Sequence, residues 1–153
     1  MKSSNKILDF SMNSTPFQNK KIINRLRKDF NNLLKIYPEP DNKSLIAYLS
    51  KHYSVPKENL YESLGATEII YRVLSTYDCK SIRITCPTFW EYEYFAKQAG
   101  KKVNKFYLKE YSDFKLNLEI FKKTIKDNEI VFLCNPNNPT SKLIQKKELK
   151  KMI

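Results

Sequence analysis

The sequence predicts an α/β fold with a mostly parallel sheet and helices on both faces. From about residue 66 onward, strand-like and helix-like segments alternate, a pattern typical of parallel α/β sheets. Residues 130–134 form a short, continuous apolar run, which indicates a strand covered on both faces. With 153 residues and 41% hydrophobic content, the chain has enough apolar material for one domain or for part of a larger one.

In the first part of the chain, the sequence predicts an irregular arm over residues 1–18 and then two helices. The prolines of "YPEPD" end the first helix, over residues 19–37. Asp41 is expected to cap the second, over residues 42–53. Residues 55–63 indicate a loop or a short strand. The first helix has one apolar face, which consists of Ile22, Ile23, Leu26, Phe30, Leu33 and Leu34. In the second helix, Leu45, Tyr48 and Leu49 are predicted to face inward.

The remainder alternates between helix and strand. One predicted helix starts at Pro87 or Thr88 and ends at Gly100, since glycine commonly terminates helices. Predicted helices cover residues 64–77, 87–100, 117–126 and 144–153, and predicted strands cover residues 80–86, 101–108 and 129–134.

The net charge of +12 comes mostly from lysines spread along the whole chain. A basic chain can bind nucleic acid or an acidic membrane surface. No arginine-rich stripe, zinc-finger spacing or aromatic RNA-binding motif accompanies the charge, so we interpret it as solvated surface. A basic nucleic-acid-binding module is the alternative, and retention on a nucleic-acid column at moderate salt would favour it.

The cysteines and the N-terminus predict a cytoplasmic protein. The chain has three cysteines, Cys79, Cys86 and Cys134. The odd number and the absence of a C-x-x-C pair argue against disulfides and structural zinc. The N-terminus lacks the apolar core of a signal peptide, and no apolar run has the length of a membrane span. We therefore expect no metal site and no membrane partner.

Three junctions carry the residues suited to ligand binding. In open parallel sheets, ligands bind beyond the carboxyl ends of the strands. Gly65 precedes Ala66 and Thr67 at a predicted helix start, where free N–H groups and the helix dipole favour phosphate. Phe89 follows a strand end and could stack on a flat ring. Asn138, between prolines, could hydrogen-bond a polar ring atom.

Each of these features also has a plain structural interpretation. The glycine segment is then an ordinary turn in which Thr67 is the N-cap of the helix. Phe89 is then a core aromatic residue, and Asn138 is a residue of an Asx turn. Spacing alone does not decide between the two sets of interpretations.

Five segments taken together resemble the N-terminal part of the fold-type I, pyridoxal-5′-phosphate (PLP) dependent aminotransferases of class I/II. They are "LDFSMNSTPF", "YPEPDNKSLIAYLSKHYSVPKENL", "LGATEIIYRVL", "CPTFWEYEYFAKQAGKKV" and "VFLCNPNNPTSKLI". They follow the family's order and span nearly the whole chain. The similarity is greatest to the branch of histidinol-phosphate aminotransferase and L-threonine-O-3-phosphate decarboxylase, and the first and last segments favour the decarboxylase side.

The resemblance implies a role for each matching residue. Gly65, Ala66 and Thr67 match the loop that binds the PLP phosphate. Phe89 matches the aromatic residue that stacks on the pyridine ring, and Asn138 matches the asparagine that bonds the 3-hydroxyl oxygen.

Two further residues match positions outside these junctions. Tyr37 matches a tyrosine that reaches the partner subunit's cofactor phosphate in a homodimer. Asn13 matches a residue of the N-terminal arm near the substrate. On this basis, residues 1–40 are expected to form the arm and first helix, and residues 41–153 the N-terminal portion of the PLP-binding large domain.

The sequence departs from the family pattern in several places. Leu64 and Thr15 each stand where the family usually has Asn, and Ser141 stands where it has Gly. The family's Schiff-base lysine, the aspartate at the pyridinium nitrogen and the carboxylate-binding arginine have no matching position up to Ile153. We therefore expect no catalytic residue in this chain.

The resemblance implies part of an enzyme that acts on a phosphorylated amino acid or amino alcohol. The reaction would be transamination or decarboxylation. The alternative is a catalytically inactive, truncated fragment that lacks the Schiff-base lysine.

Overall fold

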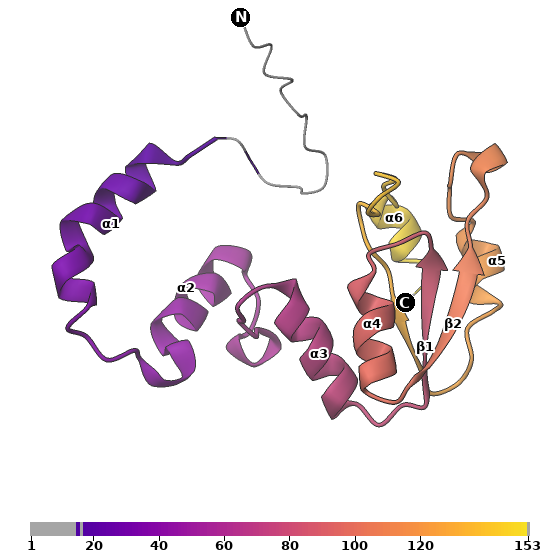
Figure 1. The fold of residues 1–153 in the computed structure, drawn as a ribbon, viewed down its shortest axis with the longest axis horizontal. Helices are drawn as coiled ribbons and strands as arrows, with labels where there is room; N and C mark the ends of the chain where they lie inside the picture. Colours follow the sequence, from indigo (N-terminus) through magenta and orange to yellow (C-terminus); the bar gives the residue numbers. More distant parts are fainter. Residues whose placement is uncertain (1–14, 16, 153) are drawn as a thin grey trace, which may run out of the picture. The chain divides into compact units, whose positions relative to one another are not determined.

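The computed structural model describes residue 15 and residues 17–152, which divide into two compact units. The first unit reaches to Tyr61 and the second begins at Glu62. Figure 1 follows the elements along the chain. None of the helices in the described part is long and apolar enough to cross a membrane. The division at residue 40 inferred from the family stays a prediction.

The first unit contains α1 (Lys20–Leu33) and α2 (Lys43–Tyr53), with one-turn 3₁₀ segments at Pro40–Asn42 and Lys57–Asn59. Both helices were predicted from the sequence. The side chain of Asn19 caps α1 by accepting a hydrogen bond from the Ile22 N–H at 3.3 Å. Residues 55–63 contain a 3₁₀ turn and no strand.

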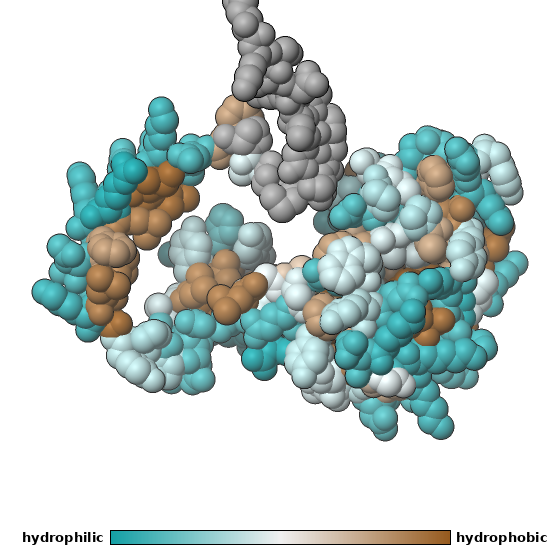
Figure 2. Space-filling view, in the orientation of Figure 1, coloured by the Kyte–Doolittle hydropathy of each residue, from teal (hydrophilic) through white to brown (hydrophobic). Residues whose placement is uncertain are grey.

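The predicted apolar face of α1 is present and is largely exposed within the described residues. Figure 2 shows these side chains gathered along one side of the helix. Hydrophobic periodicity identifies the face that a helix can bury, but it does not supply the element that covers it. Ile23 is half-buried, and five members are between 50% and 71% exposed, namely Ile22, Leu26, Phe30, Leu33 and Leu34.

Two predictions for α2 are wrong. Leu45 and Tyr48 do not face inward, since they are 45% and 64% exposed, and Asp41 does not cap the helix. Asp41 lies inside the preceding 3₁₀ turn with φ +61°, and the N-cap residue is Asn42, whose side chain makes no capping bond. Glu39 instead accepts hydrogen bonds from the Ser44 N–H, at 3.0 Å, and from the Ser44 hydroxyl. These bonds hold the pKa of Glu39 below its ordinary value.

The second unit is built on a three-stranded parallel sheet in the order β2-β1-β3. Its strands are β1 (Ser81–Cys86), β2 (Lys102–Tyr107) and β3 (Glu129–Phe132). In register, Ile84 of β1 lies opposite both Lys105 and Phe132. The predicted parallel sheet is therefore confirmed, and its three strands end close to the same level.

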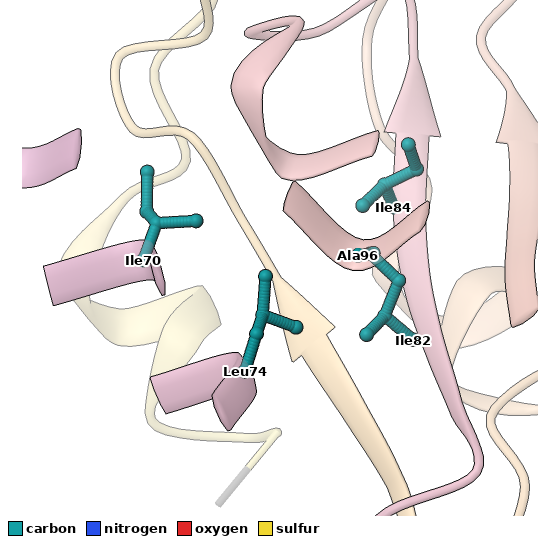
Figure 3. Packing of buried hydrophobic residues seen from close by; sticks show 5 residues of the cluster. All are labelled: Ile70, Leu74, Ile82, Ile84 and Ala96. Atoms are coloured by element: carbon teal, nitrogen blue, oxygen red, sulfur yellow. The ribbon is translucent and has the colours of Figure 1, made fainter. Parts of the chain in front are cut away.

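Helices cover both faces of this sheet, as predicted. α3 (Ala66–Thr76) and α4 (Glu91–Gln98) pack on one face. On the other face, α5 (Leu118–Lys122) places Phe121 edge-on against Phe106 of β2, with ring centroids 5.2 Å apart. The last helix is α6 (Lys146–Leu149). The core of the first face, drawn in Figure 3, consists of Ile70, Leu74, Ile82, Ile84 and Ala96.

α4 begins at Glu91, three or four residues later than predicted. The Thr88 hydroxyl donates to the Asn137 side chain, so the segment before Glu91 is fixed by the loop after β3 rather than by helix formation. The predicted terminus is confirmed. Gly100 has φ +68°, and the Lys101 N–H bonds the carbonyl of Ala96, as expected for a helix that ends at glycine.

A polar network crosses the face of the sheet opposite the α3/α4 core. The Arg83 Nε donates to the Glu129 carboxylate at 2.7 Å, and their side chains are only 8% and 0% exposed. Asn104 of β2 donates to the same carboxylate at 2.6 Å. Burial raises the pKa of Glu129, but hydrogen bonds from Asn104, Arg83 and the Lys126 N–H outweigh it, so the pKa is lowered overall.

This network predicts an acid-sensitive fold. Replacement of Glu129 by Gln should lower the free energy of unfolding at pH 7 by about 3 kcal/mol, because it leaves a buried Arg83 without its counter-charge. A carboxylate with a lowered folded-state pKa stabilises the fold above its unfolded pKa, and this contribution is lost as the pH falls through the folded value. Urea unfolding between pH 7 and pH 3 should therefore give a shallower acid loss for E129Q than for the wild type. An identical slope in both proteins would contradict the assignment.

Candidate functional site

Hydrogen bonds join the three junctions at the carboxyl end of the sheet. The Thr67 hydroxyl at the start of α3 donates to Glu91 at the start of α4, at 2.6 Å. The Thr88 hydroxyl, between β1 and α4, donates to Asn137 in the loop after β3, at 2.8 Å. The segments that contain Gly65–Thr67, Phe89 and Asn138 are therefore held at one edge of the sheet.

The N-terminus of α3 presents backbone donors. Gly65 is the N-cap residue with φ +106° and ψ 172°, a conformation that favours glycine, although a Cβ would meet nothing within 4 Å. In the described part of the chain, no acceptor bonds the N–H groups of Ala66 and Thr67. Helix-start donors of this kind suit an anion. The Glu68 carboxylate accepts a hydrogen bond from the Leu64 N–H at 2.9 Å, which holds the turn before α3 in place.

Thr67 does not have the capping role of the plain structural interpretation. Gly65 occupies the N-cap position, and the Thr67 hydroxyl is bonded to Glu91 on the neighbouring helix. Glu91 is half-buried, whereas Thr67 is exposed. Glu91 was not among the residues predicted from the sequence, where its signal is an acidic residue in the first turn of the next helix.

Asn137 fastens the loop after β3 to the loop after β1. Its buried side chain donates to the Pro87 carbonyl at 3.0 Å and to the Thr140 hydroxyl at 2.8 Å, and it accepts from Thr88. All of its amide donors and one acceptor position are thereby used. Sequence analysis did not single out Asn137, because adjacent asparagines in a proline-flanked turn look alike.

Asn138 differs from its neighbour. Its side chain is exposed, and no hydrogen bond to it is found among the described residues. It therefore makes no Asx turn here, and its amide is available to a ligand. The peptide bonds Asn135–Pro136 and Asn138–Pro139 are both cis.

Phe89 is half-buried and packs against the α3/α4 core. Its ring meets Tyr92 edge-on, with centroids 5.6 Å apart. Tyr92 in turn stacks on Phe132 of β3 at 4.9 Å. Burial, followed by the nearby Cys134, raises the pKa of Tyr92 to about 12, so its phenol stays protonated at neutral pH.

The two remaining predicted residues lie elsewhere. Tyr37 belongs to the first unit and is 89% exposed. Asn13 lies outside the described residues. The described residues also form no cluster of three His, Cys, Asp or Glu side chains that could hold a metal ion.

The fold and the site together define the class of protein: a parallel α/β domain with a helix start whose N–H groups are open, an aromatic residue and an available asparagine at one sheet edge. Residues 4–153 match the family described as "Aminotransferase class I and II". This chain belongs to that family.

Particular relatives carry two different names. The histidinol-phosphate aminotransferase of Methanococcus aeolicus is 37% identical over 96% of this chain and 41% of its own length. The threonine-phosphate decarboxylase of Salmonella typhimurium is 31% identical over 92% of this chain and 39% of its own length. A histidinol-phosphate aminotransferase structure from Clostridium acetobutylicum is 28% identical, with a TM-score of 0.80 over 95% of this chain and 42% of that chain. The chain thus spans about two fifths of these relatives.

Asn137 is predicted to matter for stability. Substitution of Asn137 by Ala should lower the free energy of unfolding by about 2–3 kcal/mol, because the Pro87 carbonyl and the two threonine hydroxyls lose a partner in a buried setting. Asn138→Ala serves as the matched control, since it removes no recorded bond and should change stability by less than about 0.5 kcal/mol. Urea unfolding measures both, and equal losses would contradict the distinct roles assigned to the two residues.

Ser141 is predicted to hold a strained backbone conformation. Its φ is +58°, in the left-handed region, and its N–H bonds the Asn137 carbonyl at 2.6 Å. Replacement by Gly should raise the free energy of unfolding by about 1 kcal/mol, because glycine adopts this region without the Cβ clash. Ser141→Ala, which keeps the Cβ, should give no gain. A gain from Ala equal to that from Gly would show that the hydroxyl, rather than the backbone, sets the cost.

Proposed function

We propose that residues 1–153 supply part of the cofactor site of a PLP-dependent enzyme that acts on a phosphorylated amino acid or amino alcohol. The observation that carries the proposal is the hydrogen-bonded assembly of the three family junctions at one edge of the sheet. Family membership supports the identity of the cofactor. The printed names of the relatives, which refer to histidinol phosphate and threonine phosphate, support the substrate class.

The residues present fit this cofactor. The N–H groups of Ala66 and Thr67, at the start of an 11-residue helix, have no acceptor among the described residues and suit its phosphate. The half-buried ring of Phe89 suits a flat heteroaromatic ring. The exposed amide of Asn138 suits a ring oxygen. When bound, the cofactor supplies an electron sink, and the protein supplies binding, orientation and electrostatics.

In this proposal each junction has one task. The α3 turn holds the phosphate and so fixes one end of the cofactor. Phe89 limits the position of the ring, and Asn138 sets its rotation within the plane. Asn137 acts indirectly, since its bonds to Pro87 and Thr88 hold the two loops together.

The longer protein that the family implies would be a homodimer and cytoplasmic. Tyr37, exposed in the first unit, is proposed to reach the partner subunit's cofactor phosphate. Asn13 is proposed to lie near the substrate. Transamination and decarboxylation both remain open, because relatives of both names match.

Cofactor binding can be tested on the 153-residue chain itself. Pyridoxine 5′-phosphate is the suitable probe, because it lacks the aldehyde that would react with the many lysines. Isothermal titration should detect binding by the wild type, and Asn138→Ala should weaken it by about 5- to 10-fold, as expected for one lost hydrogen bond.

Asn24→Ala on α1 is the matched control, because it removes the same amide far along the chain from the site. It should leave the affinity unchanged. The proposal fails if the wild type does not bind the probe, and the role of Asn138 fails if its variant binds as tightly as the control.

A further inference from the structure

The turn at the start of α3 faces a carboxylate that phosphate binding does not require. Glu91, the first residue of α4, accepts the Thr67 hydroxyl proton through its Oε2, with the two oxygens 2.6 Å apart. A short bond of this kind is the charge-assisted type, which is stronger than a neutral hydrogen bond. The contact therefore fixes the orientation of the Thr67 hydroxyl.

The charge of Glu91 has no counter-charge in an ion pair within the described residues. Neighbouring carboxylates differ in this respect. Glu93, two residues along α4, contacts both Lys97 and Lys105 at 2.7 Å. Glu68 on α3 contacts Arg72 at 2.8 Å. Glu91 is thus the carboxylate at this turn that brings negative charge without a paired cation.

While this contact is made, the Thr67 hydroxyl cannot also donate a hydrogen bond to a phosphate. A threonine hydroxyl has one proton to donate and otherwise presents acceptor lone pairs. While Glu91 holds that proton, an anion at the Ala66 and Thr67 N–H groups meets lone pairs of the hydroxyl oxygen. It also meets the field of a nearby like charge, which weakens its binding.

We propose that Glu91 sets the phosphate affinity of the α3 turn by holding the Thr67 hydroxyl proton and by opposing a second negative charge there. Glu91 is a positioning residue that acts through Thr67. The inference rests on the proposed function, because it concerns the same phosphate-binding turn. It goes beyond the proposed function, because it predicts that the Glu91 carboxylate lowers the affinity of this turn for a phosphorylated ligand.

The test is the isosteric variant Glu91→Gln. Its amide can donate to the Thr67 oxygen, which keeps the α3–α4 link and releases the hydroxyl proton toward a phosphate. Isothermal titration should show about tenfold tighter binding of pyridoxine 5′-phosphate, the effect of one charge-assisted hydrogen bond, and no change for pyridoxine, which lacks the phosphate. An equal gain for both ligands would overturn the proposal, because the effect would not be specific to phosphate.

Two further variants separate the proposed cause from others. Glu119→Gln on α5 changes the net charge by the same amount away from the turn and should leave the affinity unchanged. An equal gain there would overturn the proposal in favour of bulk charge. The gain from E91Q should also shrink when Thr67 is replaced by Val, because only the effect of the Glu91 charge then remains; a gain of full size would show that Thr67 does not transmit it.

The outcomes also separate this inference from the proposed function. If the wild type binds the phosphorylated probe and E91Q binds it equally or more weakly, the role of Glu91 is overturned while the cofactor site stands. If only E91Q binds, the role of Glu91 is supported and the wild-type site is too weak to hold the cofactor. If neither binds, the turn is not a phosphate site, and both proposals fall.

Discussion

The second unit depends on one buried carboxylate at the centre of its sheet. Glu129 of β3 accepts hydrogen bonds from Arg83 of β1 and Asn104 of β2, so a single side chain connects all three strands. A register slip of one residue would turn Glu129 to the other face and leave a charge among the apolar side chains of α3 and α4. Because the register is fixed in this way, the strands end near one level, and the loop after β1 comes within reach of Asn137 in the loop after β3.

At this edge, bonded and unbonded polar groups divide into two sets with different tasks. Asn137 and Thr88 are bonded to each other, and their bonds determine where the loops lie. The amide of Asn138 and the backbone donors of Ala66 and Thr67 find no partner in the described chain. These donors are exposed at the carboxyl ends of the strands, so a ligand that reaches this edge of the sheet can bond them without breaking a bond within the described chain.

The sequence predicted what depends on local pattern and missed what depends on distant partners. The three strands and six helices follow from apolar periodicity, and Gly100 follows from the preference of helix ends for glycine. The start of α4 was misplaced because Thr88 bonds a residue 49 positions away. Asn137 and Glu91 were missed for the same reason: their importance arises from contacts across the fold. The apolar face of α1 was identified correctly, but periodicity alone could not show that it is exposed.

The positions where this chain departs from the family pattern differ in physical consequence. Leu64 replaces an amide donor, yet its own N–H still bonds Glu68 and its side chain is 98% exposed, so the turn before Gly65 keeps its backbone geometry. Ser141 is a different case, because its φ of +58° places a Cβ in a region that only glycine occupies freely. The chain therefore has one side-chain donor fewer at the turn before Gly65 and a more strained backbone at Ser141.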